Sequence, residues 1–202
     1  MEACSIKEHS ENIFSSGYGS LPVSVLKSLV LLGANSSGKS NLFKGFDLMR
    51  NMVMYSAIET GSSKISKIEP FRLNTETEHK YTLFECTIVI DGICYRYGFK
   101  GNSREIHSEW LYMVAKRREE IVFIRTKNEY EIIKRFPANY KSKLLMLTEL
   151  TRNDALYISV LAQFNIDMGL QISNWFASNI TYGEPDLNDA INYTVELLAD
   201  PV

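Results

Sequence analysis

The chain has 202 residues, of which 45% are hydrophobic, and a formal net charge of −2. This length suits one domain or one and a half, and the apolar share excludes a wholly disordered chain. The near-neutral charge offers no overall basic field of the kind that attracts nucleic acid. No apolar run reaches the roughly 18 residues of a membrane span, and no signal peptide opens the chain. A cytoplasmic protein without a membrane partner is therefore the default expectation.

The three cysteines, Cys4, Cys86 and Cys94, stand in no metal-binding spacing. Cys86 and Cys94 flank a predicted hairpin turn, an arrangement that would let them face each other. In an intracellular chain they are expected to stay reduced.

Taken in order, the first 21 residues are polar and rich in serine and glycine, which predicts irregular structure. Residues 26–49, LKSLVLLGANSSGKSNLFKGFDLM, then predict a buried strand, a glycine-rich loop and a helix. The apolar run at residues 28–32 is typical of a parallel strand covered on both faces. From Asn41 onward, apolar residues recur close to the helical period up to a predicted end near Glu59. These apolar residues are Leu42, Phe43, Phe46, Met49, Met52 and Val53.

The loop at residues 33–40, GANSSGKS, fits the phosphate-binding motif G-x-x-x-x-G-K-[ST] without a mismatch. Gly33 permits a sharp exit from the strand, and Gly38 lets the backbone approach a phosphate oxygen. The loop amides would form an anion-binding nest at the positive end of the helix. Lys39 is then predicted to reach the β- and γ-phosphates of ATP, and the Ser40 hydroxyl to ligate Mg²⁺.

The predicted nucleotide-binding residues are Gly33, Ala34, Asn35, Ser36, Ser37, Gly38, Lys39, Ser40 and Asn41. The alternative is an ordinary Gly-Ser turn before a core helix, which would need neither Lys39 nor Ser40.

A run of strands follows an extended connection at residues 65–74. Residues 81–90 and 93–99 alternate, and Asp91-Gly92 between them is a two-residue hairpin signal. Further strands are predicted at residues 109–115, 121–126 and 130–134, which makes an antiparallel meander of about five strands. Helical patterns come next, at residues 144–150, 156–164, 168–178 and 187–199.

ATP hydrolysis needs a second strand that ends in an aspartate, together with a carboxylate that polarises water. Asp91 follows an apolar run and is the best candidate for that aspartate, but the hairpin interpretation is favoured. No LSGGQ-like signature is present, so the catalytic residues stay unassigned. The basic run at residues 116–118 is interpreted as a solvated turn, and Trp110 and Tyr112 as core residues, with nucleic-acid contact as the less favoured alternative.

The segments GANSSGKSNLFKGF, EPFRLN, YRYGF and IHSEWLY, in this order, resemble a bacterial family of ABC-type ATPases that carry the AAA label. These are the abortive-infection and OLD-like ATPases, relatives of structural-maintenance-of-chromosomes heads. The resemblance covers about residues 8–179. Its phosphate-binding loop is shared by many families, whereas the E-W-L-Y and Y-R-Y-G-F pieces are more specific.

The resemblance implies an α/β fold, that of a P-loop NTPase with an ABC-ATPase-like head. Residues 22–60 would form the phosphate-loop strand and helix, residues 78–136 an antiparallel β layer, and residues 141–200 a helical region. It also implies ATP and Mg²⁺, a homodimer of the intact protein, and often a role in phage defence or on nucleic acid. Family members have a further upstream strand and a further half-chain, so residues 1–202 are expected to be the N-terminal part of one head.

Two functions therefore remain open. One is the ATP-binding portion of a dimerising ATPase, which as this polypeptide would not hydrolyse ATP. The other is a non-hydrolysing nucleotide-sensing or protein-interaction module. A signature segment followed by an apolar strand ending in Asp-Glu, beyond residue 202, would decide for the ATPase.

Overall fold

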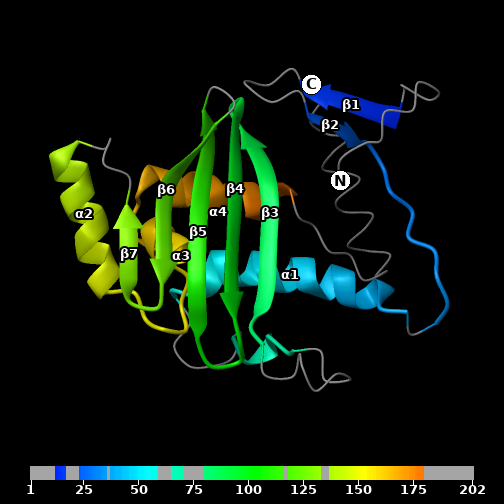
Figure 1. Ribbon diagram of the computed structural model, residues 1–202, viewed down its shortest axis with the longest axis horizontal. Helices are drawn as coiled ribbons and strands as arrows, with labels where there is room; N and C mark the ends of the chain where they lie inside the picture. Colours follow the sequence, from blue (N-terminus) through cyan, green and yellow to red (C-terminus); the bar gives the residue numbers. More distant parts are fainter. Residues whose placement is uncertain are drawn as a thin grey trace, which may run out of the picture.

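The computed structural model describes residues 12–16, 23–35, 37–58, 65–70, 80–115, 118–132 and 137–179. Figure 1 shows a five-stranded sheet with helices behind it and a separate two-stranded hairpin. The elements are β1 (Ile13–Ser16), β2 (Val23–Leu26), α1 (Lys39–Tyr55), η2 (Ile65–Lys67), β3 (Thr82–Ile90), β4 (Ile93–Gly101), β5 (Ile106–Ala115), β6 (Arg118–Thr126), β7 (Glu129–Ile132), α2 (Ala138–Glu149), α3 (Tyr157–Gln163) and α4 (Asp167–Asn179). No described helix is both long enough and apolar enough to cross a membrane.

The large sheet is an antiparallel meander in the order β3-β4-β5-β6-β7, as the alternating sequence pattern predicts. Asp91 and Gly92 turn the chain between β3 and β4, with φ angles of 49° and 76°. Both angles are positive, as a tight hairpin turn of this length requires, and aspartate and glycine tolerate them. The predicted hairpin is thus confirmed, and Asp91 is a turn residue.

One face of this sheet carries the hydrophobic core, and α1, α3 and α4 lie behind that face (Figure 1). Aromatic side chains join the two layers. The rings of Tyr97 and Phe176 meet edge to face with centroids 6.2 Å apart, and those of Phe123 and Tyr157 with centroids 5.0 Å apart. Such pairs add about 0.5–1.5 kcal/mol each to the free energy gained by burying their area. The predicted helices at residues 144–150, 156–164 and 168–178 are confirmed as α2, α3 and α4, whereas residues 187–199 lie outside the described part.

A buried carboxylate fastens α3 to the centre of the sheet. Glu109 on β5 accepts hydrogen bonds from the Tyr97 hydroxyl at 3.0 Å and from the backbone N–H groups of Tyr157 and Ile158 at 2.6 and 3.0 Å. Burial raises the pKa of Glu109, and the charge of Arg125 and the two amides oppose that rise. The Arg125 guanidinium lies 3.8 Å from the Glu109 carboxylate, and both side chains are fully buried.

The C-terminal end of α1 is held by the chain around α3. Arg152 donates to the carbonyl oxygens of Ser56 and Ala57 at 2.9 and 3.1 Å. The Ala57 N–H donates to the Ser159 hydroxyl at 3.1 Å, and the Leu156 N–H donates to the Ser56 hydroxyl at 3.0 Å. These bonds satisfy groups that a helix end leaves unpaired, so this end of α1 is fixed.

The predicted strand at residues 28–32 is wrong. These residues form no strand, and the exposed fractions of Leu29, Val30 and Leu32 are 49%, 77% and 90%. A parallel strand of this kind needs neighbouring strands at its edges and helices over both of its faces, and the other described strands belong to the meander or to the β1–β2 hairpin. Without such neighbours, the apolar run stays exposed.

The prediction of irregular structure before residue 22 is wrong for β1, which pairs antiparallel with β2. The prediction that Cys86 and Cys94 face each other is also wrong. Cys86 lies opposite Tyr97 and Cys94 opposite Val89, so the two thiols are on different faces of the hairpin, and both are free. Burial raises the pKa of the half-buried Cys86 thiol to about 12.

The core assignment of Trp110 and Tyr112 is wrong as well, because the core residue between them is Leu111. In a strand, successive side chains point to opposite faces, so Trp110 and Tyr112 lie on the outer face of the sheet. The Trp110 N–H donates to the Glu85 carboxylate at 2.8 Å, and the Arg96 guanidinium stacks 4.3 Å from the centre of the Tyr112 ring.

Candidate nucleotide-binding site

The loop at residues 33–40 leads directly into α1, whose first residue is Lys39. Gly38 is the N-cap and has a φ of 91°, in the region that favours glycine. The N–H groups of Asn41 and Leu42 already bond to the Gly38 carbonyl at 3.0 and 3.3 Å. The N–H groups before them, in the first turn, have no acceptor within the helix and are available for an anion.

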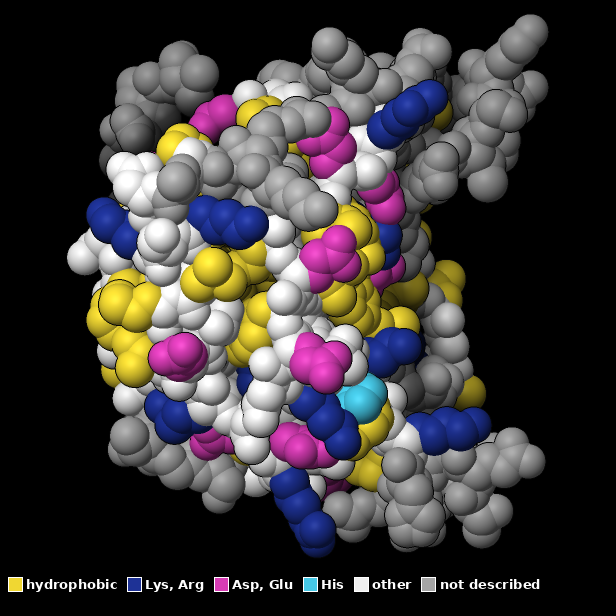
Figure 2. All heavy atoms as spheres, turned by 60° about the vertical axis from the view of Figure 1, so that its left-hand side comes forward, with side chains coloured by type: hydrophobic (Ala, Val, Ile, Leu, Met, Phe, Trp, Pro, Cys, Tyr) yellow, Lys and Arg dark blue, Asp and Glu magenta, His cyan; other side chains and the backbone are white. Residues whose placement is uncertain are grey.

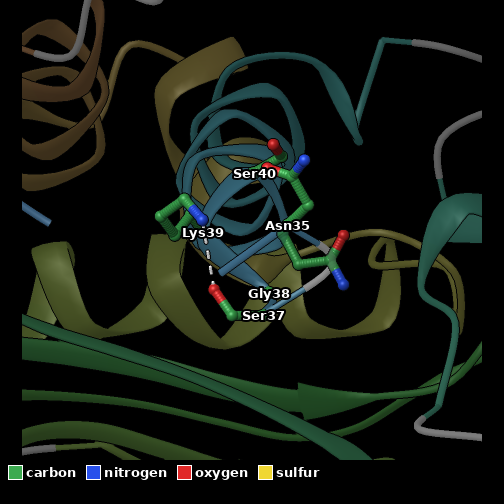
Figure 3. Close-up of a pocket in the computed structure, with 6 residues that line it drawn as sticks. Asn35, Ser37, Gly38, Lys39 and Ser40 are labelled. Atoms are coloured by element: carbon green, nitrogen blue, oxygen red, sulfur yellow. Dashed lines mark hydrogen bonds between the residues drawn. The ribbon is translucent and has the colours of Figure 1, made fainter. Parts of the chain in front are cut away.

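The Lys39 ammonium lies inside this loop. It donates to the carbonyl oxygens of Gly33 and Ala34 at 2.6 and 2.7 Å and to the Ser37 hydroxyl at 3.2 Å. Figure 3 shows Lys39 turned toward Ser37 across the opening of the loop. These bonds place a positive charge at the start of α1, where the partial positive charge of the helix end adds to it.

A cavity of about 460 Å³ opens at this point, and its lining comes from both the loop and the first turn of α1. The lining residues are Asn35, Ser37, Gly38, Lys39, Ser40 and Asn41. Gly33 and Ala34 contribute the carbonyl oxygens that Lys39 contacts, and Ser36 lies outside the described residues. The structure therefore brings the other predicted residues together around one opening.

The donor groups at this cavity suit a magnesium–nucleotide polyphosphate. Nothing lies within 4 Å of where a Cβ on Gly38 would be, so the backbone there is open to a phosphate oxygen. Lys39 would supply the cation for the phosphates, and the exposed hydroxyl of Ser40 is a hard oxygen of the type that Mg²⁺ accepts. The bound nucleotide would supply the phosphoanhydride, and these residues would bind and orient it.

No carboxylate in the described part of the chain is assigned as a second magnesium ligand beside the Ser40 hydroxyl. Asp91, the candidate from sequence, is in the β3–β4 turn, at the end of the sheet away from the loop that precedes α1 (Figure 1). The described residues include no group of three or more His, Cys, Asp or Glu side chains that could hold a metal ion. They thus contain groups for holding phosphates, without an assigned group for activating water.

The basic run at residues 116–118 lies partly outside the described residues, and Arg118 is an exposed residue at the start of β6. Figure 2 views the molecule from the side of α2 and β7, where basic and acidic side chains are interspersed among hydrophobic ones. On the outer face, Arg96 is neutralised by Glu85 and Glu119, each 2.7 Å away. The sequence did not predict this cluster of Arg96, Glu85 and Glu119, because only the strand register shows that the three residues are neighbours.

A glycine-rich loop of this sequence, placed at a helix N-terminus around a lysine, defines the class of phosphate-binding-loop proteins. Residues 28–165, more than half of the chain, match the family described as "AAA domain, putative AbiEii toxin, Type IV TA system". The chain belongs to this family of AAA-type, ATPase-like proteins. No curated protein and no solved structure matches the chain.

Proposed function

We propose that the protein binds ATP with Mg²⁺ at residues 33–41 and belongs to an ATPase that dimerises around the nucleotide. The observation that supports this most directly is the geometry of Lys39, whose ammonium lies among Gly33, Ala34 and Ser37 at the start of α1. Membership of an AAA-type family, whose match includes this loop, also supports nucleotide binding. Ser40 is the proposed magnesium ligand.

The proposal extends to an ABC-type head related to the OLD-like and structural-maintenance-of-chromosomes ATPases, in which the meander is the β layer and α2 to α4 the helical region. It also extends to a role in phage defence. The family description names a toxin of a type IV toxin–antitoxin system, and the sequence resembles abortive-infection ATPases. A role on nucleic acid is the less supported alternative, because the described basic side chains do not gather on the face seen in Figure 2.

Titration calorimetry with ATP and ADP tests the binding site. Lys39→Ala should weaken nucleotide binding about 10- to 100-fold, because a charge-assisted hydrogen bond contributes roughly 1.5–3 kcal/mol. Lys44→Ala is a matched control, since Lys44 is an exposed lysine of the same helix that does not line the cavity. Unchanged affinity in a folded Lys39→Ala variant would refute the site.

A non-hydrolysing nucleotide sensor is the second candidate function. It is favoured by the position of Asp91 in the β3–β4 hairpin turn, at the end of the sheet away from this loop (Figure 1). Asp91→Asn should therefore leave Mg²⁺-dependent nucleotide binding nearly unaltered. A large loss of Mg²⁺ dependence would mean that Asp91 reaches the metal.

Single-turnover hydrolysis of labelled ATP separates the two functions. Loop contacts that act equally on the ground state and the transition state favour binding over turnover. The 202-residue chain should therefore hydrolyse ATP at no more than a background rate. Turnover near 1 s⁻¹, at the low end of ordinary enzyme rates, that is lost in Lys39→Ala would instead place a catalytic carboxylate within these residues.

A further inference from the structure

Strand β3 lies at one edge of the five-stranded sheet formed by the described residues. All nine residues of β3 pair with β4 in a continuous register, and β3 pairs with no other strand in the described part of the chain. The strand contains one charged side chain, Glu85, and no proline, while Leu83 and Val89 are 55% and 39% exposed. A long, regular and mostly apolar edge of this kind is a template for pairing with another strand.

The hairpin turn determines which backbone groups face outward at this edge. In a two-residue hairpin, Ile90 and Ile93 next to the turn form a hydrogen-bonded pair. Bonded and non-bonded pairs then alternate, so the even-numbered residues of β3 bond to β4. The odd-numbered residues present their N–H and C=O groups at this edge, and they are Leu83, Glu85, Thr87 and Val89.

The sequence of β3 is complementary to itself. If two copies pair antiparallel about a twofold axis at Cys86, Leu83 lies opposite Val89 and Glu85 opposite Thr87, and all nine residues overlap. These are pairs of odd-numbered residues, so their backbone groups can bond across the edge. Moving the axis to residue 85 would set two glutamates opposite each other, and moving it to residue 87 would shorten the overlap.

Helix α1 offers a matching surface beneath this edge. Figure 1 shows its N-terminal half extending past β3, beyond the sheet. Three large apolar side chains of that half, Leu42, Phe43 and Phe46, are 41%, 48% and 44% exposed. A sheet continued across the β3 edge would lie over this part of α1 and would reduce the exposure of these side chains.

We propose that a second copy of this chain pairs with the first along β3, in the antiparallel register centred on Cys86, to form one sheet that runs through both copies. The partner is a second copy because the register that pairs the whole strand also avoids like charges. This interface goes beyond the proposed nucleotide function and does not involve the loop at residues 33–40.

Disulfide trapping tests the register. The three natural cysteines, Cys4, Cys86 and Cys94, are first replaced by alanine. In this background, Leu83→Cys and Val89→Cys are prepared as separate proteins, since both side chains are on the outer face and neither is buried. Hydrogen-bonded cross-strand pairs have Cα atoms about 5.5 Å apart, within the range that a disulfide spans.

Mild oxidation of an equimolar mixture of the two variants should give a covalent dimer on a non-reducing gel. Each variant oxidised alone should stay monomeric, because residue 83 lies opposite residue 89 and not opposite itself. Cross-linking of a single variant with itself would refute the register. A mixture that stays monomeric would refute the interface. Pairing of the β1–β2 hairpin of the same chain with the edge of β3 would refute it as well.

Charge substitution at Thr87 gives a second, non-covalent test by light scattering and sedimentation. Thr87→Glu sets a like charge opposite Glu85 twice in the dimer and should weaken dimerisation about 2- to 30-fold. Thr87→Gln, which adds no charge opposite Glu85 or beside Arg96, is the control and should leave dimerisation nearly unchanged. Equal effects of the two variants, or a wild-type chain that stays monomeric, would refute the proposal even if nucleotide binding is intact.

Discussion

The sheet with its helices and the segment that leads to the nucleotide loop contain similar apolar residues in opposite environments. Leu111 on β5 is fully buried, whereas Leu32, just before the loop, is 90% exposed. Leu111 has a strand on each side and helices behind it, and Leu32 has neither among the described residues. The comparison teaches that the burial of a leucine is decided by what surrounds it and not by the local sequence.

Helix α1 spans both environments. Its C-terminal half buries Met49, Met52 and Val53, while its N-terminal half exposes Phe43 and Phe46. We therefore expect most of the folding free energy to come from the sheet and the helices behind it. The loop at the other end of α1 would contribute to ligand binding more than to stability. Four substitutions test this division, from the largest expected effect to the smallest.

Glu109→Ala should lower the free energy of unfolding by about 3–5 kcal/mol, because removing one partner of a buried ion pair leaves Arg125 without its counter-charge. The substitution also leaves the Tyr157 and Ile158 amides without their acceptor. Urea denaturation followed by circular dichroism measures the loss. Glu85→Ala, at a partly exposed glutamate in an ion pair with Arg96, is the control and should cost less than about 1 kcal/mol.

Gly169→Ala should destabilise the fold by roughly 1–3 kcal/mol, the usual cost of overpacking a core. The distance from a Cβ at Gly169 in α4 to the Ala162 backbone nitrogen in α3 would be far shorter than a van der Waals contact. Because the obstacle is backbone, the two helices would have to move apart. A thermal midpoint equal to that of the wild type would show that α3 and α4 are packed less tightly than this distance indicates.

Gly45→Ala makes the same change in the exposed half of α1 and should have the opposite sign. Nothing lies within 4 Å of the added Cβ, so only helix propensity is affected. The gain expected is about 0.5–1 kcal/mol, which the same urea denaturation can resolve. A loss of stability would instead indicate that this face of α1 contacts another surface in solution.

Leu32→Gln should change the free energy of unfolding by less than about 0.5 kcal/mol, as is usual for exposed positions. Leu111→Ala provides the comparison and should cost about 2–5 kcal/mol. If Leu32→Gln cost as much as Leu111→Ala, Leu32 would be buried in solution and the two regions would not differ.

The meander could be predicted from sequence because its information is local. Alternating residues in β3 and β4 flank Asp91-Gly92, and a turn of this type and length determines their register. The position of the loop at residues 33–40 before α1 was predictable for a similar reason, since its residues are consecutive and most of those described line one cavity. For both features, the neighbours in space are also neighbours in sequence.

The errors arise where a residue depends on distant partners. The run at residues 28–32 has the composition of a buried strand, but composition does not specify which strands lie beside it. Trp110 and Tyr112 have the residue types of a core, but strand alternation around Leu111 places them outside. The contact of Glu109 with Tyr157 joins residues 48 positions apart, which no local pattern reveals.

The hydrogen bonds that hold the C-terminal end of α1 have a consequence for amide hydrogen exchange along the helix. At the C-terminal end, Arg152 and Ser159 hold Ser56 and Ala57, so amides near Val53 should exchange only when the whole protein unfolds. Amides near Phe43 should exchange through local fraying, orders of magnitude faster. A bound nucleotide would slow exchange at the frayed end first, so the protection gradient along this single helix would itself report occupancy of the loop.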